Sequence, residues 1–193
     1  MKEITLNEKQ LLPSMLKISE PKCNLMQELI KKNTNDKLYT KMLMDKIGLV
    51  SNFQYNKLQE LEKEKEQQII HGDFYLDNLI INKNKIKAID YEQTGLFYKE
   101  YEVIRALFMI CYNPKFDDNK NLENMKKFIE GYKKFDKNID LQFGIELFSY
   151  SSANSLYCYD DWNKSTDSIK EYAKYRYEML KWILINKKEI LKS

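Results

Sequence analysis

The sequence has few cysteines, glycines and prolines: 3, 5 and 3 among 193 residues. The cysteines, Cys23, Cys111 and Cys158, are odd in number and widely spaced, which does not match the paired spacing of a zinc site or a redox motif. We expect them to be reduced and mostly in the core. No internal repeat and no low-complexity linker divides the chain.

Long hydrophobic runs and an excess of one charge sign are also missing. Runs such as Leu79 to Ile81 and Trp182 to Ile185 are far shorter than a membrane span, and the N-terminus lacks the apolar stretch of a signal peptide. The formal net charge is only +3, and both signs are scattered, so no basic arm is available to hold nucleic acid phosphates. We therefore expect a cytoplasmic protein with no membrane and no nucleic-acid partner.

What the chain does have is enough apolar surface for a packed core, because hydrophobic residues make up 43% and aromatic residues 13% of it. We predict one domain over residues 1–193, of the α+β class and mainly helical. Its parts are a helical section over 1–68, a loop and hairpin over 69–92, and a second helical section over 93–193.

Apolar residues recur at helical spacing over most of the chain, and breaks in this spacing divide it into separate helices. The predicted helices cover Cys23 to Lys32, Asp36 to Ile47, Asn52 to Gln68, Tyr101 to Tyr112, Leu122 to Phe135, Leu141 to Trp162 and Ile169 to Leu191.

The pattern changes between the two helical sections. The apolar segments Leu79 to Ile81 and Ile86 to Ile89 are separated by a polar stretch that includes Asn82 to Asn84, which predicts a β-hairpin. Because apolar residues occur on both strands, we expect the hairpin to be buried and to lower the local dielectric constant at its end.

Candidate catalytic residues flank this hairpin. The string His-Gly-Asp-Phe-Tyr-Leu-Asp-Asn runs from His71 to Asn78, and Asp90 follows the second strand. Phosphoryl transfer needs a carboxylate to orient the attacking hydroxyl and oxygen ligands to hold magnesium against the nucleotide phosphates. Asp73, Asn78 and Asp90 are side chains of these types, and the hairpin would return the chain so that Asp90 can face Asn78.

Taken singly, these residues have simpler interpretations. His71 would be a buried histidine with a structural role, and Asp73 and Asn78 would be turn and cap residues. Their joint occurrence with Asp90 after a predicted hairpin favours the functional interpretation.

The string and the later Ile-Asp-Tyr-Glu together resemble the H-G-D-x-x-x-x-N and I-D-[FWY]-E motifs of the aminoglycoside phosphotransferase and choline kinase family, whose members have a protein-kinase-like fold. The resemblance implies that Asp73 is the catalytic base, that Asn78 and Asp90 bind Mg²⁺, and that His71 braces the loop. It further implies ATP as phosphoryl donor and a small-molecule hydroxyl, of an aminoglycoside, choline or a similar compound, as acceptor.

The resemblance continues beyond the motifs. The segment Gly95 to Leu107 is similar to the loop and helix that follow the metal-binding acid in that family, where Glu102 would be the acidic residue that opens the helix. The similarity runs from Ile69 to the C-terminus and so concerns the C-terminal lobe of a kinase.

A weaker candidate for substrate binding lies near the C-terminal end of one predicted helix. Asp160 and Asp161 beside Trp162 could line a pocket for a cationic substrate, because carboxylates and an aromatic face both attract ammonium groups. The same three residues could simply end the helix.

The residues before His71 do not match the family. Its members carry a β-rich N-terminal lobe with a phosphate-contacting lysine, whereas this segment reads as helical and has Gly48 as its only glycine. We expect the nucleotide lobe to be absent or truncated. The chain would then be part of a longer kinase, receive the lobe from a partner, or be a non-catalytic binding module. An accidental motif in a helical interaction protein is a further alternative.

Overall fold

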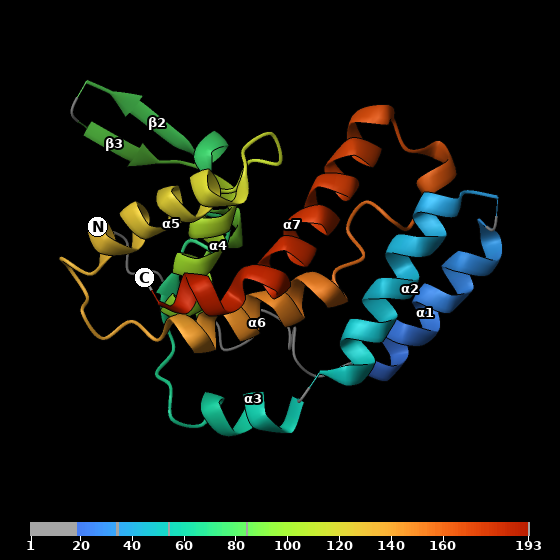
Figure 1. The fold of residues 1–193 in the computed structure, drawn as a ribbon, viewed down its shortest axis with the longest axis horizontal. Helices are drawn as coiled ribbons and strands as arrows, with labels where there is room; N and C mark the ends of the chain where they lie inside the picture. Colours follow the sequence, from blue (N-terminus) through green and yellow to red (C-terminus); the bar gives the residue numbers. More distant parts are fainter. Residues whose placement is uncertain (1–18, 34, 54, 84, 193) are drawn as a thin grey trace.

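The computed structural model describes residues 19–33, 35–53, 55–83 and 85–192 (Figure 1). Helices make up most of these ranges, and the short strands form two antiparallel pairs. The helices are α1 (Ser19–Lys32), α2 (Lys37–Asn52), α3 (Tyr55–Glu62), α4 (Lys99–Cys111), α5 (Asp118–Tyr132), α6 (Leu141–Asn154) and α7 (Asp167–Leu191). The strands are β1 (Gln68–Ile70), β2 (Leu79–Asn82), β3 (Lys85–Ala88) and β4 (Gly95–Phe97).

Helix α6 is the centre of the helical body, and it packs against α2, α4 and α7. Most of its residues are buried, as expected for a helix with apolar residues on every side. Asp140 begins the helix as its N-cap, because its carboxylate accepts the N–H of Phe143 at 2.9 Å. Gly144 allows a close approach to α4: a Cβ there would lie 2.6 Å from Cγ1 of Ile104 and 2.7 Å from the carbonyl oxygen of Glu100.

A second hydrophobic cluster joins α1 and α2 to the segment between α6 and α7 (Figure 1). Its aromatic part consists of Tyr39, Tyr159 and Trp162, and the hydroxyl of Tyr39 donates to the carbonyl of Tyr159 at 3.0 Å. Asp36 links α2 to the segment that contains Trp162. One of its carboxylate oxygens caps α2, and the other accepts the indole N–H of Trp162 at 2.8 Å. A smaller cluster of Val50, Ala153 and Leu180 lies among α2, α6 and α7.

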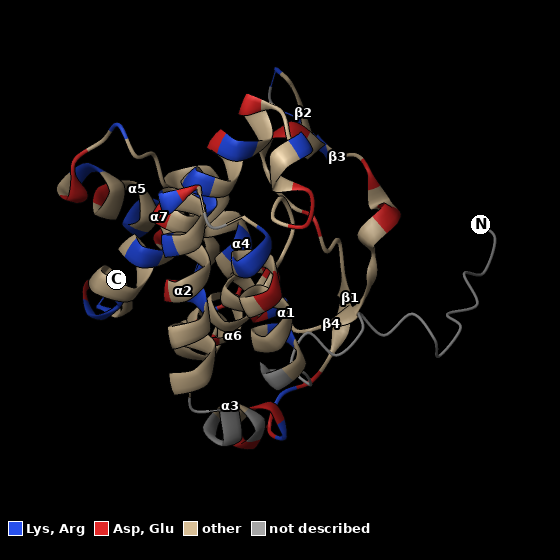
Figure 2. Ribbon diagram, turned by 90° about the vertical axis from the view of Figure 1, so that its right-hand side faces the viewer, with Lys and Arg blue, Asp and Glu red and all other residues tan. Residues whose placement is uncertain are grey.

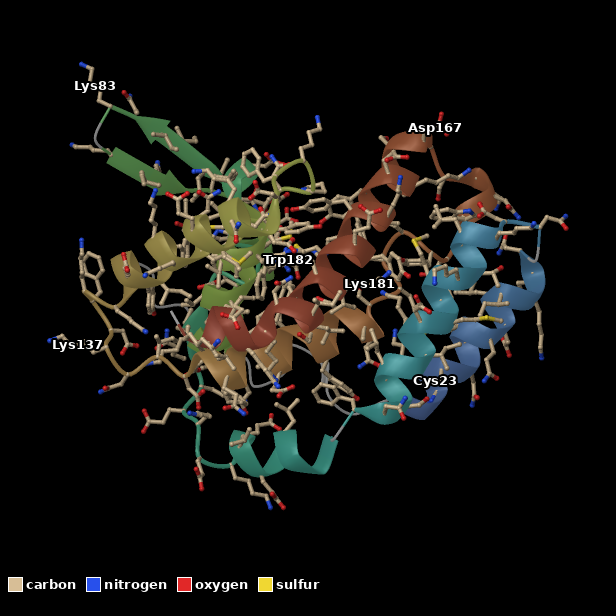
Figure 3. All side chains as sticks on the ribbon, viewed as in Figure 1. Cys23, Lys83, Lys137, Asp167, Lys181 and Trp182 are labelled. Atoms are coloured by element: carbon tan, nitrogen blue, oxygen red, sulfur yellow. The ribbon has the colours of Figure 1, made fainter. Side chains whose placement is uncertain are left out.

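The predicted β-hairpin is confirmed, with β2 and β3 paired from Leu79 opposite Ala88 to Asn82 opposite Lys85. Its predicted burial is wrong. Ile81 and Ile86 are 64% and 67% exposed, because the hairpin extends away from the helices, with Lys83 at its tip (Figures 1 and 3). Only its base, at Leu79 and Ala88, is partly buried.

Two predicted helices are shorter than expected. The stretch predicted to run to Gln68 ends at Glu62, and Gln68 instead begins β1, which pairs with β4. The helix predicted to reach Trp162 ends at Asn154. The helix ends there because the side chain of Lys46 caps it: Nζ donates to the carbonyl oxygens of Ser152 and Ser155 at 2.9 and 2.6 Å.

Surface charges of both signs are interspersed over the helices (Figure 2). Within the described ranges, no helix is both long enough and apolar enough to cross a membrane. The three cysteines are free thiols: Cys111 is buried, and Cys23 and Cys158 are partly buried.

The contact at Gly144 gives a test of the α4 to α6 packing. We expect Gly144→Ala to lower the free energy of unfolding by about 1–3 kcal/mol, since the added methyl group overlaps the backbone of α4. Gly48→Ala is the control: it also lies within a helix, but a Cβ there meets no atom within 4 Å. It should stabilise the protein by about 0.4–1 kcal/mol. Urea denaturation measures both, and wild-type stability of Gly144→Ala would contradict the packing.

Candidate active site

The loop between β1 and β2 has a backbone conformation that requires glycine at one position. Gly72 has φ +80°, and a Cβ there would lie only 2.2 Å from the carbonyl oxygen of Gln93. The N–H of Gly72 donates to Oε1 of Glu102 on α4 at 2.7 Å. The loop is therefore held closely between the segment after β3 and helix α4.

His71 joins this loop to the end of the hairpin. Its ring is buried, with Nδ1 accepting the N–H of Asp73 at 3.3 Å and Nε2 lying 2.9 Å from the carbonyl of Ile89. These two bonds assign a neutral ring with its hydrogen on Nε2, which donates to Ile89. Phe74 and Tyr91 pack against the ring, at centroid distances of 5.8 and 4.8 Å. His71 thus positions Asp73 and the residue before Asp90 together.

The carboxylate of Asp73 lies between a cation and an amide. One oxygen accepts from the guanidinium of Arg105, and the other accepts from Nδ2 of Asn78 at 3.1 Å. The same Nδ2 also donates to the backbone carbonyl of Asp73 at 2.8 Å, and the Asn78 side chain is buried. The structure therefore brings Asp73 and Asn78 into direct contact.

Asn78 and Asp90 stand at the same end of the hairpin, because the N–H of Ile89 donates to the carbonyl of Asn78 at 3.0 Å. Asp90 has a left-handed backbone, with φ 62° and ψ 69°, and it is exposed. The donor types at this end fit a magnesium ion. Asn78 directs its amide nitrogen to Asp73, and its amide oxygen and the carboxylate of Asp90 are hard oxygen ligands of the kind that Mg²⁺ prefers. Within the described residues, no group of three or more His, Cys, Asp or Glu could hold a metal alone.

Helix α4 supplies two residues that hold the loop. Glu102 and Arg105 are three positions apart and so lie on one face of the helix, where they bind Gly72 and Asp73. Burial raises the pKa of Glu102 above its usual value, and the hydrogen bond from Gly72 opposes that rise. The sequence indicated Glu102 by its place after the motifs. It gave no signal for Arg105, because a basic residue within a helix is usually solvated.

A cavity of about 980 Å³ opens beside Asp73 and extends along α7 to the segment that follows α6. Tyrosines form much of its wall: Tyr75, Tyr101, Tyr157, Tyr159, Tyr172 and Tyr177. Its charged lining residues are the basic Lys22, Lys46, Arg105 and Arg176 and the acidic Asp73 and Asp77. Asp73 therefore faces a space large enough for a small organic molecule.

The weaker substrate candidates lie outside the lining of this cavity. Trp162 is buried in the second cluster and donates its indole N–H to Asp36. Asp160 and Asp161 are exposed, and Asp161 forms an ion pair with Lys164 at 3.3 Å. The structure does not bring these three residues together with Asp73, because Trp162 turns inward to pack on Tyr39.

Comparison with solved structures shows a fold like that of the choline kinase from Cryptosporidium parvum Iowa II, with a TM-score of 0.57. The two sequences are 16% identical, and the alignment covers 99% of this chain but 61% of the kinase chain. At this identity the likeness shows the fold, which is kinase-like. No protein-family model matches the sequence, and no curated protein is significantly similar to it.

The contact between Glu102 and Gly72 can be tested with a matched pair of variants. Glu102→Leu leaves the N–H of Gly72 without an acceptor, so we expect the free energy of unfolding to fall by about 1–3 kcal/mol. Glu102→Gln keeps an acceptor oxygen and should cost less. Urea denaturation at neutral pH measures both variants. Equal stabilities of the two would show that this hydrogen bond does not hold the loop.

Proposed function

We propose that this chain is an ATP- and Mg²⁺-dependent phosphotransferase that moves the terminal phosphoryl group of ATP to a hydroxyl of a small molecule. The supporting observation is the position of Asp73: it contacts Asn78 and Arg105 and faces the tyrosine-lined cavity. The kinase-like fold is compatible with this chemistry, which depends mainly on positioning and charge stabilisation.

Asp73 is the proposed catalytic base. The acceptor hydroxyl would lie in the cavity within hydrogen-bond distance of the Asp73 carboxylate, which takes its proton as the hydroxyl oxygen bonds to the γ-phosphorus. The bond between that phosphorus and the oxygen bridging to the β-phosphate breaks, and ADP leaves with that oxygen. Arg105 and Asn78 fix the orientation of the carboxylate, and Asn78 adds no charge.

Asn78 and Asp90 are the proposed magnesium ligands. When bound, the ion would neutralise charge on the nucleotide phosphates, whose own oxygens complete its coordination. This explains why two protein ligands suffice at the end of the hairpin. The His71 ring helps to position these ligands, because it holds Ile89, the residue before Asp90, to the loop that carries Asp73 and Asn78.

A non-catalytic binding module is the second candidate, and one observation favours it. Among the described residues the strands form only two pairs, so this part of the chain contains no β-rich nucleotide lobe. Such a module would keep the loop and hairpin for folding and would not bind Mg-ATP. Isothermal titration calorimetry with Mg-ATP separates the two candidates, since saturable binding contradicts the second.

We expect Asp73→Asn to reduce phosphoryl transfer by about a hundredfold or more, because an amide cannot accept the hydroxyl proton. Transfer is measured as ADP formation in a screen of hydroxyl-bearing metabolites and antibiotics. Glu66→Gln, an exposed position before β1, removes the same charge outside the loop and should keep full activity. Unchanged turnover in Asp73→Asn would remove Asp73 from the role of base.

Asp90→Asn tests the metal site separately from the base. Its neutral side chain is a poorer magnesium ligand, so we expect at least about tenfold weaker binding of Mg-ATP, with little change in the binding of ATP in EDTA. Calorimetry gives both affinities, with Glu66→Gln again as the charge control. If both variants bind Mg-ATP as the wild type does, Asp90 is not a ligand.

A further inference from the structure

Arg176 on α7 lines the cavity, and none of the described carboxylates pairs with it. Its Nη1 lies 3.4 Å from the sulfur of Met109 and 3.4 Å from the hydroxyl of Tyr172. The guanidinium also lies over the rings of Phe148 and Tyr172, at 5.8 and 6.0 Å from their centroids. In the described part of the chain, no Asp or Glu oxygen lies within 4.0 Å of its nitrogens. By contrast Arg105, in the same cavity, is paired with Asp73.

An arginine in this setting has unused capacity to bind an anion. It is partly buried, and a thioether, a phenol and two ring faces do not neutralise its charge. A planar guanidinium matches carboxylate and phosphate groups through two parallel hydrogen bonds. The surrounding rings hold the side chain in place and exclude part of the water, which strengthens such a contact.

A second cation lies close to Arg176. Lys46 is 5% exposed, and its ammonium lies 4.8 Å from the centroid of the Tyr159 ring. Burial, and then the charge of Arg176, lower the pKa of Lys46 to about 7. Ser152 and Asn154, which also line the cavity, each have a buried side-chain oxygen with no hydrogen-bond partner among the described residues. The lining near Arg176 therefore includes a second basic side chain whose charged form is disfavoured, so Arg176 is the group there that stays positively charged.

The position of Arg176 relative to Asp73 follows from helix α4. Arg105, which binds Asp73, and Met109, which contacts Arg176, are four residues apart on α4. Side chains four apart on a helix lie about 6 Å from each other on one face. Arg176 and the pair of Arg105 with Asp73 therefore contact one face of α4, and all three residues line the same cavity.

We propose that the cavity binds a small molecule with a carboxylate or phosphate group at Arg176 and a hydroxyl at Asp73. The inference rests on the proposed function, because the bound compound is taken to be the phosphoryl acceptor. A cationic acceptor is disfavoured, since it would meet the guanidinium of Arg176, and the described lining residues include no carboxylates besides Asp73 and Asp77. Aminoglycosides and choline, which carry positive charge, fit a site at Arg176 poorly.

The test uses a property of the sequence: Arg105 and Arg176 are its only arginines. A ¹H–¹⁵N spectrum of arginine Nε groups therefore has two side-chain signals, which the variant Arg176→Gln assigns. The wild type is titrated without ATP with inorganic phosphate and with four related six-carbon compounds: gluconate, glucose 6-phosphate, glucose and glucosamine. We expect saturable shifts of the Arg176 signal with the anions and none with glucose or glucosamine.

Variants then locate the binding. Arg176→Gln should weaken binding of the anion that shifts the signal by about tenfold or more, and Arg176→Lys should retain part of it. Lys188→Gln removes one charge from the exposed side of the same helix and should bind as the wild type does. Urea denaturation checks that each variant folds. If Arg176→Gln does not fold, the wild-type titration and Arg176→Lys decide.

The outcomes separate this inference from the proposed function. No shift of the Arg176 signal with phosphate, gluconate or glucose 6-phosphate, or an equal shift with glucosamine, overturns the anion site even if phosphoryl transfer is found. Anion binding that depends on Arg176 supports the site even if no acceptor is phosphorylated, in which case the proposed function fails. Gluconate and glucose 6-phosphate distinguish a carboxylate from a phosphate as the bound group.

Discussion

The hydrogen bond from the N–H of Gly72 to Glu102 fixes the candidate active site to the helical body. Glu102 and Arg105 are both on α4, so the loop backbone and the Asp73 carboxylate are positioned by the same helix face. Helix α4 is in turn held against α6 by the close contact at Gly144. The orientation of Asp73 therefore depends on packing between two helices whose sequences carry no catalytic residue.

The site combines a rigid side with an exposed side. Asp73 and Asn78 belong to a loop fixed by Glu102, Arg105 and the ring of His71. Asp90, by contrast, follows β3 at the base of the hairpin, whose strands extend from the body (Figure 1). The helices can thus organise Asp73 and the cavity beside it, while Asp90 is exposed at the base of the hairpin.

The sequence predicted the elements whose signals are local. Helical periodicity indicated the α-helices, and two apolar segments around a polar turn indicated the hairpin. The pairing of β1 with β4 was not predictable, because strands of three residues each, far apart in sequence, carry little periodicity. The end of α6 was missed because it depends on Lys46, over a hundred residues away.

In the candidate site, the residues within one short motif were predictable from the sequence, and their partners on other helices were not. The spacing of Asp73 and Asn78 indicated residues that the structure places in contact, but it could not indicate Arg105 or Arg176, whose partners come from distant segments. The exposure of the hairpin was also not predictable, because apolar residues such as Ile81 and Ile86 do not reveal whether the rest of the chain covers them.

The central position of α6 has a consequence for how the protein unfolds. Three helices share its surface, because α2 and α7 contact α6 at Ala153 and α4 contacts it at Gly144. Separating α1 and α2 from the body would uncover Ala153 of α6, which clusters with Val50 of α2, and separating α4 would expose the residues around Gly144. Loss of either group of helices thus removes support from the other, so the helical body has the connectivity of one cooperative unit.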